Sequence, residues 1–333
     1  MSTAHETEKA AHVPVQISSG ESEVTASVPA RRQDLRIRCP RCEANLEGLE
    51  CPFCGLAMRK SRGIVHALPP DRASHFARFV SDYERIRTAE GRGSASDEFY
   101  FNLPFKDMSG ANQEHWKIRA STFEHLMDRV LTGSAARGRK VLDLGAGNGW
   151  LSYRLALGGW HPVAVDLLTN DYDGLGAATH FEKRIPGLFP RFQAELASLP
   201  FQSDQFDAAV FNASFHYAED FSRGLGEALR CVKPGGLVVI ADTPWYARDE
   251  SGQAMLAERR ETFLRRYGTA SDSIQCLEYL TDYRLRALAE QFAIEWQILH
   301  PPYGWRWALR PIMAKLRGRR EPSRFRIYVT KKR

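Results

Sequence analysis

The sequence predicts an α/β protein with a mostly parallel central sheet, and three stretches carry this prediction. Residues 141–156 are an apolar run ending in an acid, then glycines at alternate positions, then apolar residues at helical spacing, which is the order of strand, tight turn and helix. Residues 161–166 read as a second strand that ends in an acid. Residues 228–242 run from a helix end through Lys-Pro-Gly-Gly into a further strand. In such a sheet, ligands bind beyond the carboxyl ends of the strands.

The glycine-rich turn after the first of these strands is typical of a cofactor loop. Glycine adopts backbone angles that other residues avoid, and it lets a ligand approach the backbone closely. A dinucleotide fingerprint would place its third glycine at position 150, but this chain has Trp150 there. The interpretation as a dehydrogenase is therefore weakened.

The acid that ends the second strand supports a nucleoside ligand. Asp166 lies 21 residues past Gly145, the separation at which a carboxylate can accept both ribose hydroxyls of an adenosine. The alternative is that Asp166 only caps the next helix. The nearby stretch 170–176 is rich in acids, amides and glycines, and we interpret it as a turn that borders the cofactor or the substrate.

An acid inside the strand followed by Gly-x-Gly-x-Gly resembles the first motif of the class I S-adenosylmethionine (SAM) dependent methyltransferases, of the type 11 kind. Further matches follow in order: Glu195, where that family commonly has Asp, then Leu-Pro-Phe at 199–201, Phe-Asp at 206–207, and the Lys-Pro-Gly-Gly turn. The resemblance implies a Rossmann-like, seven-stranded, mostly parallel sheet over residues 105–333. Its last two strands, at 292–299 and 324–329, would form a terminal antiparallel hairpin.

The same resemblance implies which residues bind SAM. Asp143 would orient the methionine moiety, Asp166 would hold the ribose, and Glu195 would meet the adenine amine. The glycine loop would approach the cofactor by its backbone. The full expected set is Asp143, Gly145, Ala146, Gly147, Gly149, Asp166, Leu167, Glu195, Leu196 and Asn212.

Residues 212–217 follow the fourth strand and should line the pocket. His216 is the candidate catalytic base because imidazole titrates near neutral pH. Tyr217 would orient the substrate. The alternative for His216 is packing or contact with the cofactor, and the alternative for Tyr217 is simple packing. Residues 243–290 have helical character, and their place after the fifth strand suits a substrate lid.

Cys39, Cys42, Cys51 and Cys54 form two Cys-x-x-Cys pairs, eight residues apart. Four thiolates on two tight turns can close a tetrahedral zinc site, so residues 35–62 are expected to be a small zinc-ribbon-like module with structural Zn²⁺. Two disulfides are the alternative, and a reducing compartment disfavours them. With all four positions closed, the metal has no room for a substrate.

The remaining segments complete the organisation. Residues 1–34 contain no aromatic residue and are expected to be a disordered tail, and residues 63–104 a connector. The resemblance implies that a helix expected over 112–131 covers the cofactor, with Trp116 and Arg119 facing the pocket; core packing of Trp116 is the alternative. No run of about 18 apolar residues is present, and the first 20 residues lack the apolar segment of a signal peptide, so we expect a cytoplasmic protein without membrane contact.

The charge of the chain is concentrated at its C-terminus. From residue 303 to 333 there are 11 Lys and Arg against one acid, whereas the whole chain has a net charge of +6. A solvated face and a surface for phosphate or nucleic acid are both compatible with this run.

The expected function is methyl transfer to an O, N or C acceptor, with a small metabolite as the expected acceptor. Two alternatives stay open. One is methylation of rRNA or tRNA bases, which the zinc module and the basic C-terminus would serve. The other is a SAM-binding scaffold without catalysis.

Overall fold

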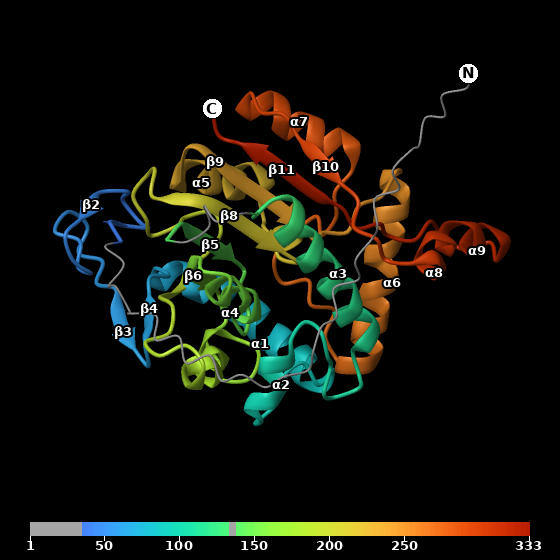
Figure 1. The fold of residues 1–333 in the computed structure, drawn as a ribbon, viewed down its shortest axis with the longest axis horizontal. Coiled ribbons are helices and arrows are strands. Elements are labelled where there is room, and N and C mark those ends of the chain that lie inside the picture. Colours follow the sequence, from blue (N-terminus) through green and yellow to red (C-terminus); the bar gives the residue numbers. More distant parts are fainter. Residues whose placement is uncertain (1–34, 133–137) are drawn as a thin grey trace, which may run out of the picture.

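The computed structural model describes residues 35–132 and 138–333, and Figure 1 shows their arrangement. The tail predicted over residues 1–34 lies outside the described residues. None of the described helices is long and apolar enough to cross a membrane.

A central sheet of nine strands organises the described chain, in the order β10-β11-β9-β8-β5-β6-β7-β4-β3. Its strands are β3 (Arg59–Ser61), β4 (Ile64–His66), β5 (Lys140–Leu144), β6 (His161–Asp166), β7 (Arg191–Gln193), β8 (Phe206–Asn212), β9 (Val232–Ala241), β10 (Gln297–Leu299) and β11 (Ile327–Lys331). All strands from β4 to β9 pair in parallel. β11 is antiparallel to β9 and to β10, which confirms the α/β class and the terminal antiparallel hairpin.

The sheet has two strands more than the seven expected, and both come from the segment after the cysteines. β4 pairs in parallel along the edge of β7, with Ile64 opposite Arg191 and His66 opposite Gln193, and β3 pairs with β4. Ile64 and Val65 are buried there, so joining the sheet also removes apolar surface from water. A run of three residues is too short to show strand periodicity, which is why the sequence alone does not reveal it.

Helices cover both faces of the sheet because its central strands are apolar on both sides. Leu142 and Leu144 of β5 pack in one core with α5 (Phe221–Cys231) and α7 (Asp282–Phe292). Val141 packs in the other core with α2 (Asp97–Asn102), α3 (Gln113–Arg129), α4 (Trp150–Leu157) and the 3₁₀ segment η2 (Leu175–Lys183). Two capping residues fix the first group: Asp220 accepts hydrogen bonds from the amides of the first turn of α5, and Thr281 accepts one at the start of α7.

Two long helices lie near the carboxyl ends of the parallel strands and contact each other: α1 (Pro70–Ala89) and α6 (Asp249–Tyr267). α1 begins with a proline at its first position, where the missing N–H costs no helical hydrogen bond. A 3₁₀ turn, η3 (Phe215–Tyr217), follows β8 near these helices. At the C-terminal side, α8 (Trp305–Ala308) and α9 (Arg310–Leu316) project from the body, at the right of Figure 1.

The cysteine segment has a small sheet of its own, β1 (Ile37–Arg38) paired with β2 (Asn45–Leu46). Its apolar residues belong to the same core as α5 and α7, and Ile37 forms a bridge with Phe201. The Arg38 guanidinium donates to Glu227 of α5. This segment is therefore packed against the body of the central sheet by apolar and polar contacts.

Candidate active site

Two adjoining cavities lie at the carboxyl ends of the parallel strands. The first holds about 1060 Å³ of empty space and the second about 1030 Å³, both counted with the space that opens to solvent. The first is lined by the glycine loop and by residues that follow β6, β7 and β8, and the second by side chains of α1, α3 and α6. Both cavities share six lining residues: Phe79, Tyr83, Arg87, Arg119, Ala213 and Tyr217. The two cavities therefore adjoin at these residues.

The glycine loop forms part of the wall of the first cavity. Gly145 and Gly147 have φ values of 76° and 55°, which favour glycine. A Cβ on Gly145 would lie 2.2 Å from the Cβ of Ser214, so the loop and the end of β8 approach closely. Gly149 also has a positive φ, but it starts α4 and faces Phe189, so it does not line the cavity.

Asp143 lies at the base of this loop and is almost completely buried. Its Oδ2 accepts hydrogen bonds from the Ser152 amide (3.1 Å) and from the Ser152 hydroxyl (2.7 Å). Burial raises the pKa of Asp143 to about 7, although these two hydrogen bonds act in the opposite direction. The carboxyl group therefore titrates near neutral pH, with one oxygen fixed by α4.

Asp166 ends β6 and faces the same cavity. Its carboxylate accepts hydrogen bonds from the Gly147 amide and from the Leu168 amide, both at 2.8 Å. Burial raises the pKa of Asp166 to about 6. A carboxylate has about four lone-pair positions, so two hydrogen bonds leave acceptor capacity for hydroxyl groups of a ligand.

Glu195 lies at the far end of the first cavity, where Arg72 of α1 fixes it. The guanidinium donates to both carboxylate oxygens (2.8 and 2.7 Å) and also to Glu219 (3.0 Å). Glu195 is buried, and it keeps free lone pairs for an amino group. The remaining expected residues Ala146, Leu167, Leu196 and Asn212 also line this cavity.

Helix α1 supplies one wall of the first cavity, although the sequence analysis expected only a connector in this part of the chain. Phe76, Phe79, Tyr83 and Arg87 recur at spacings of three and four residues, and all four line the first cavity. Arg87 forms an ion pair with Asp173, which lies in the turn predicted to border the cofactor. The signal is present in the sequence, because the apolar stripe of α1 continues into a cation one turn beyond Tyr83.

Arg119 of α3 lines both cavities and forms no ion pair or hydrogen bond within residues 35–132 and 138–333. Its guanidinium lies over the Trp116 ring at 5.0 Å. Burial lowers the pKa of Arg119, and the neighbouring Arg87 adds to this. Trp116 itself is in the core against Trp150 and lines neither cavity, so only one of the two predicted α3 residues faces the pocket.

His216 and Tyr217 lie in η3; His216 lines only the second cavity, whereas Tyr217 lines both. The Nδ1 of His216 is buried and has no hydrogen-bond partner among the described residues. Burial, and then the positive charges of Arg259 and Arg119, lower the pKa of His216 to about 3. The imidazole is therefore neutral at physiological pH, and it is a weak base. Tyr217 packs with Tyr83 (ring centroids 5.6 Å apart) and lines both cavities.

Asp242, to which the sequence interpretation gave no role, lines only the second cavity. It directly follows β9, with a φ of 51° that is uncommon for a residue other than glycine. Its Oδ1 accepts a hydrogen bond from the Thr122 hydroxyl (2.6 Å), and its Oδ2 is buried without a partner among the described residues. Burial raises the pKa of Asp242 to about 6. Its position after a parallel strand, like that of Asp166, is the available signal.

The helical insertion predicted at 243–290 forms the outer wall of the second cavity. Arg259 and Phe263 of α6 line it, and so does Glu278 from the following loop. Arg259 forms an ion pair with Glu278. The wall is thus built from charged groups that neutralise each other.

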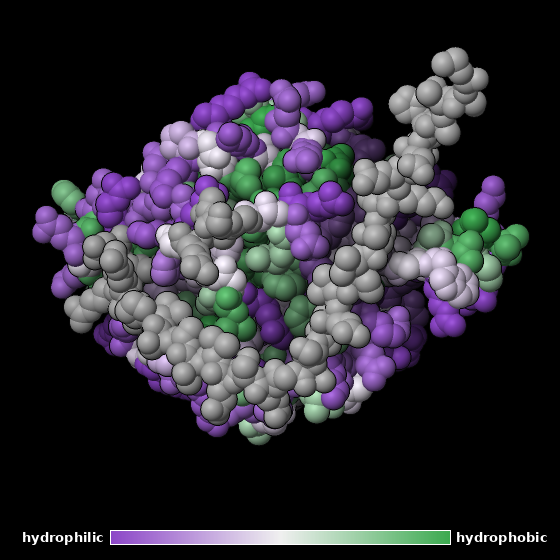
Figure 2. Space-filling view, in the orientation of Figure 1, coloured by the Kyte–Doolittle hydropathy of each residue, from purple (hydrophilic) through white to green (hydrophobic). Residues whose placement is uncertain are grey.

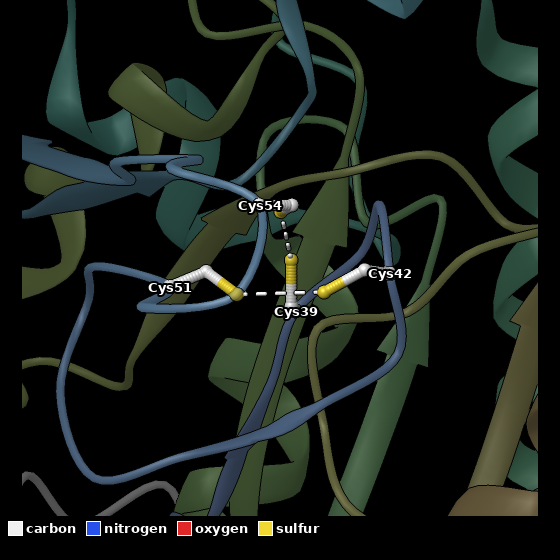
Figure 3. A group of neighbouring side chains, drawn as sticks. All are labelled: Cys39, Cys42, Cys51 and Cys54. Atoms are coloured by element: carbon white, nitrogen blue, oxygen red, sulfur yellow. Dashed lines mark hydrogen bonds between the residues drawn. The ribbon is translucent and has the colours of Figure 1, made fainter.

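The four cysteines of the N-terminal segment come together, as Figure 3 shows. Their sulfur atoms all lie within 4.8 Å of one another, with Cys39 and Cys54 at 3.5 Å and Cys42 and Cys51 at 3.4 Å. All four are free thiols. Four sulfurs on two tight turns are a donor set that could hold a tetrahedral metal ion. None of them lines either cavity.

Comparisons with known proteins agree with this geometry. Residues 142–240 match the family described as methyltransferase domain. The chain is 35% identical over 137 residues to a demethylmenaquinone methyltransferase of Clavibacter sepedonicus, which covers 40% of this chain and 50% of the relative. It is 32% identical over 176 residues to the enzyme of the same name from Beutenbergia cavernae, covering 52% of this chain and 68% of the relative.

Among solved structures, the geranyl diphosphate C-methyltransferase of Streptomyces coelicolor A3(2) is 18% identical, with a TM-score of 0.47 over 66% of this chain and 77% of that chain. The chain spans about half the length of the first curated relatives that it matches. The matched domain and the Beutenbergia relative both support the resemblance to methyltransferases that the sequence motifs indicate. The chain belongs to the class I SAM-dependent methyltransferases.

Proposed function

We propose that the protein binds SAM in the first cavity and transfers its methyl group to a small molecule in the second. The observation that carries the proposal is that the two cavities share a wall. The first has the acids and backbone amides that an adenosine needs, in the order of the family motifs. The second has unpartnered polar groups, including the Asp242 carboxylate, and adjoins the first at Ala213 and Tyr217.

The first cavity has the groups that SAM requires. Asp166 would accept hydrogen bonds from the ribose hydroxyls, and Glu195 would accept one from the adenine amino group. The backbone of the loop from Gly145 to Gly147 would contact the methionine moiety. Asp143 would orient that moiety. When bound, SAM supplies a methyl group that its sulfonium has already activated. The protein then has to align the acceptor, exclude water and remove a proton where the acceptor carries one.

Asp242 is the group best placed to take that proton. Its free Oδ2 lies in the wall of the acceptor cavity, and Thr122 fixes its other oxygen. Oδ2 would accept the proton that the acceptor loses when it takes the methyl group from SAM. A carboxyl group with a pKa of about 6 is mostly ionised above neutral pH and can accept it. His216, with its low pKa, would serve as a hydrogen-bond partner of the acceptor.

The relatives' names point to small-molecule acceptors, since two of them are named for demethylmenaquinone. Neither those names nor the described residues support the RNA alternative. The cysteine cluster would hold Zn²⁺ in a structural role, because it has four thiols and lies away from both cavities. Metal analysis of the purified protein tests this: one zinc per chain is expected, and Cys39→Ser with Cys42→Ser should remove it.

Titration calorimetry with SAM and with S-adenosylhomocysteine tests the main proposal. Micromolar binding is expected for the wild type, and Asp166→Ala should abolish it because the ribose contact is lost. Asp128→Ala is the matched control, because Asp128 is exposed on α3 and lines neither cavity. A folded, zinc-loaded wild type that binds neither ligand would sink the proposal and favour a scaffold role.

A further inference from the structure

The cavities leave one prominent surface unexplained, the C-terminal arm, defined as residues 304–320. It contains α8 and α9 and projects beyond the sheet in Figure 1. Figure 2 shows hydrophobic surface at the same right-hand end of the molecule, with hydrophilic surface around it. Five large apolar side chains of the arm are exposed: Trp305 (69%), Leu309 (41%), Ile312 (57%), Met313 (41%) and Leu316 (76%).

These apolar residues lie on one side of the arm. Their spacing, with steps of four, three, one and three residues, follows the period of a helix from position 305 to 316. Exposed apolar residues scattered over a protein surface need no explanation, but a contiguous set on one projecting element indicates an interaction surface.

The positive charge of the arm indicates an anionic partner. The arm contains six cations and no acid: Arg306, Arg310, Lys315, Arg317, Arg319 and Arg320. Arg320 pairs with Glu258, but Arg317 and Arg319 are exposed and form no ion pair within the described residues. An anionic partner would neutralise these charges, and an apolar one would cover the exposed side chains.

An anionic lipid surface satisfies both requirements at once. Interfacial helices place apolar side chains, often Trp and Leu, among the acyl chains, and Lys and Arg at the headgroups. A polynucleotide would pair with the cations but would leave Ile312, Met313 and Leu316 in water. We propose that the arm docks the protein on an anionic membrane surface.

The root of the arm connects this surface with the acceptor cavity. Trp307 stacks on Phe325 (ring centroids 5.5 Å apart), and Phe325 lines the second cavity. The Tyr303 hydroxyl, just before the arm, is 2.8 Å from the Thr122 hydroxyl, which donates to Asp242. Docking through the arm therefore brings the acceptor cavity close to the lipid, where apolar acceptors concentrate.

Vesicle sedimentation with the full chain tests this proposal. The probes are vesicles of phosphatidylcholine alone and of phosphatidylcholine with about one third phosphatidylglycerol. Wild type should bind the anionic vesicles at least about tenfold more tightly than the neutral ones, because each cation near such a surface adds to the affinity. Raising the salt concentration should reduce the binding.

Two variants separate the two parts of the surface. Ile312→Asp with Leu316→Asp should weaken binding by about 100-fold through loss of apolar insertion. Arg317→Gln with Arg319→Gln should weaken it by about tenfold or more. The controls are Leu264→Asp, exposed on α6, and Arg266→Gln with Arg286→Gln, which remove the same charge elsewhere. All controls should bind as wild type does.

Several outcomes would overturn the proposal. Equal binding to neutral and anionic vesicles, or arm variants that bind as wild type does, would exclude the arm as the docking surface. Binding of a polynucleotide without binding of vesicles would assign the cations to RNA instead. Circular dichroism and thermal unfolding, measured in parallel, show that each variant is folded and keep this test independent of the proposed cofactor binding and catalysis.

Discussion

The two cavities of this methyltransferase are built in different ways. The first takes much of its wall from residues in or soon after strands β5, β6, β7 and β8, with one face of α1 opposite them in the lining. The second takes much of its wall from side chains that α1, α3 and α6 bring from positions between 79 and 263. Residues at strand ends lie in a few motifs that follow a fixed order along the sequence. Side chains that separate helices bring together share no such motif. The first cavity suits a cofactor shared by a family, and the second a substrate particular to its member.

The largest effect is expected at Asp242, which belongs to the second cavity alone. Asp242→Asn should lower the rate of methyl transfer by about 10²–10⁴-fold, because the proton acceptor is removed. The affinity for S-adenosylhomocysteine should stay unchanged. The readout is transfer of a labelled methyl group from SAM into a small-molecule extract of the source cells.

The pH profile sharpens this prediction. The base must be ionised, so the wild-type rate should rise as the pH increases through about 6 and then level off. Thr122→Val removes a hydrogen bond that lowers the pKa of Asp242, so its profile should shift to higher pH. Asp128→Asn serves as the control. An unchanged rate and profile in Asp242→Asn would return the role of base to His216 or show that no base is needed.

Gly145→Ala should damage the first cavity and leave the second intact. The new Cβ would lie 2.2 Å from the Cβ of Ser214, so the loop must move. Overpacking of this kind costs about 1–3 kcal/mol, and we expect at least about a tenfold loss of affinity for S-adenosylhomocysteine by calorimetry.

Gly268→Ala is the matched control, because Gly268 also has a positive φ (69°) but nothing lies within 4 Å of the position that its new methyl group would take. It should lose some thermal stability and no affinity. Equal losses of affinity in the two variants would show that the tight contact of the loop with β8 does not shape the cofactor cavity.

Asp143→Asn should weaken SAM binding but stabilise the folded protein at high pH. The folded protein raises the pKa of Asp143 from 3.8 to about 7, so the native state holds this proton more tightly than the unfolded state. That stabilising contribution is complete below about pH 4 and is lost as the pH rises towards 7. The neutral Asn avoids the loss, so the variant should gain up to about 2–4 kcal/mol relative to wild type at pH 8 and little at pH 4.

Thermal unfolding at the two pH values measures this difference, and SAM affinity should fall at both. Asp207→Asn is a useful comparison, because Asp207 is half-buried at the start of β8 and lines neither cavity. If the stability of Asp143→Asn relative to wild type did not depend on pH, the raised pKa of Asp143 would be contradicted.

The smallest effect is expected at Arg72, which does not line the cofactor cavity itself but fixes the lining residues Glu195 and Glu219. Arg72→Gln should weaken SAM binding by about three- to tenfold, because a partly buried ion pair that fixes Glu195 is lost. Arg78→Gln, on the exposed side of the same helix, should have no effect. A loss above about 100-fold would mean that Arg72 touches the cofactor itself.

The contrast between the two cavities also explains which residues of the site the sequence predicts. Asp143, Asp166 and Glu195 each lie in or directly after a strand in a recognisable motif, and the structure places all three around one cavity. Arg119 is predicted at the pocket from its helix, and it lies there. Asp242 carries no motif, because its role depends on Thr122, which is 120 residues away in the chain.

The fold shows the same limit at the edge of the sheet. Strands β5 to β9 are apolar runs or lie in motifs, and the sequence predicts them. β4 has three residues, and only its partner β7 makes it a strand. The periodic pattern of α1 and the cation that extends it are visible in the sequence, but tertiary packing decides that this face lines the cavities.

The pairing of β4 with β7 also has a consequence for the order of events during synthesis. Residue 64 leaves the ribosome well before its partner, residue 191, which is 127 positions later (191 minus 64). At about 5–20 residues per second, the cysteine segment is made roughly 6–25 s before the strand that anchors it. If the four cysteines bind a metal ion, as we propose, that site would give this segment a structure of its own during the interval and protect its thiols until β7 is made.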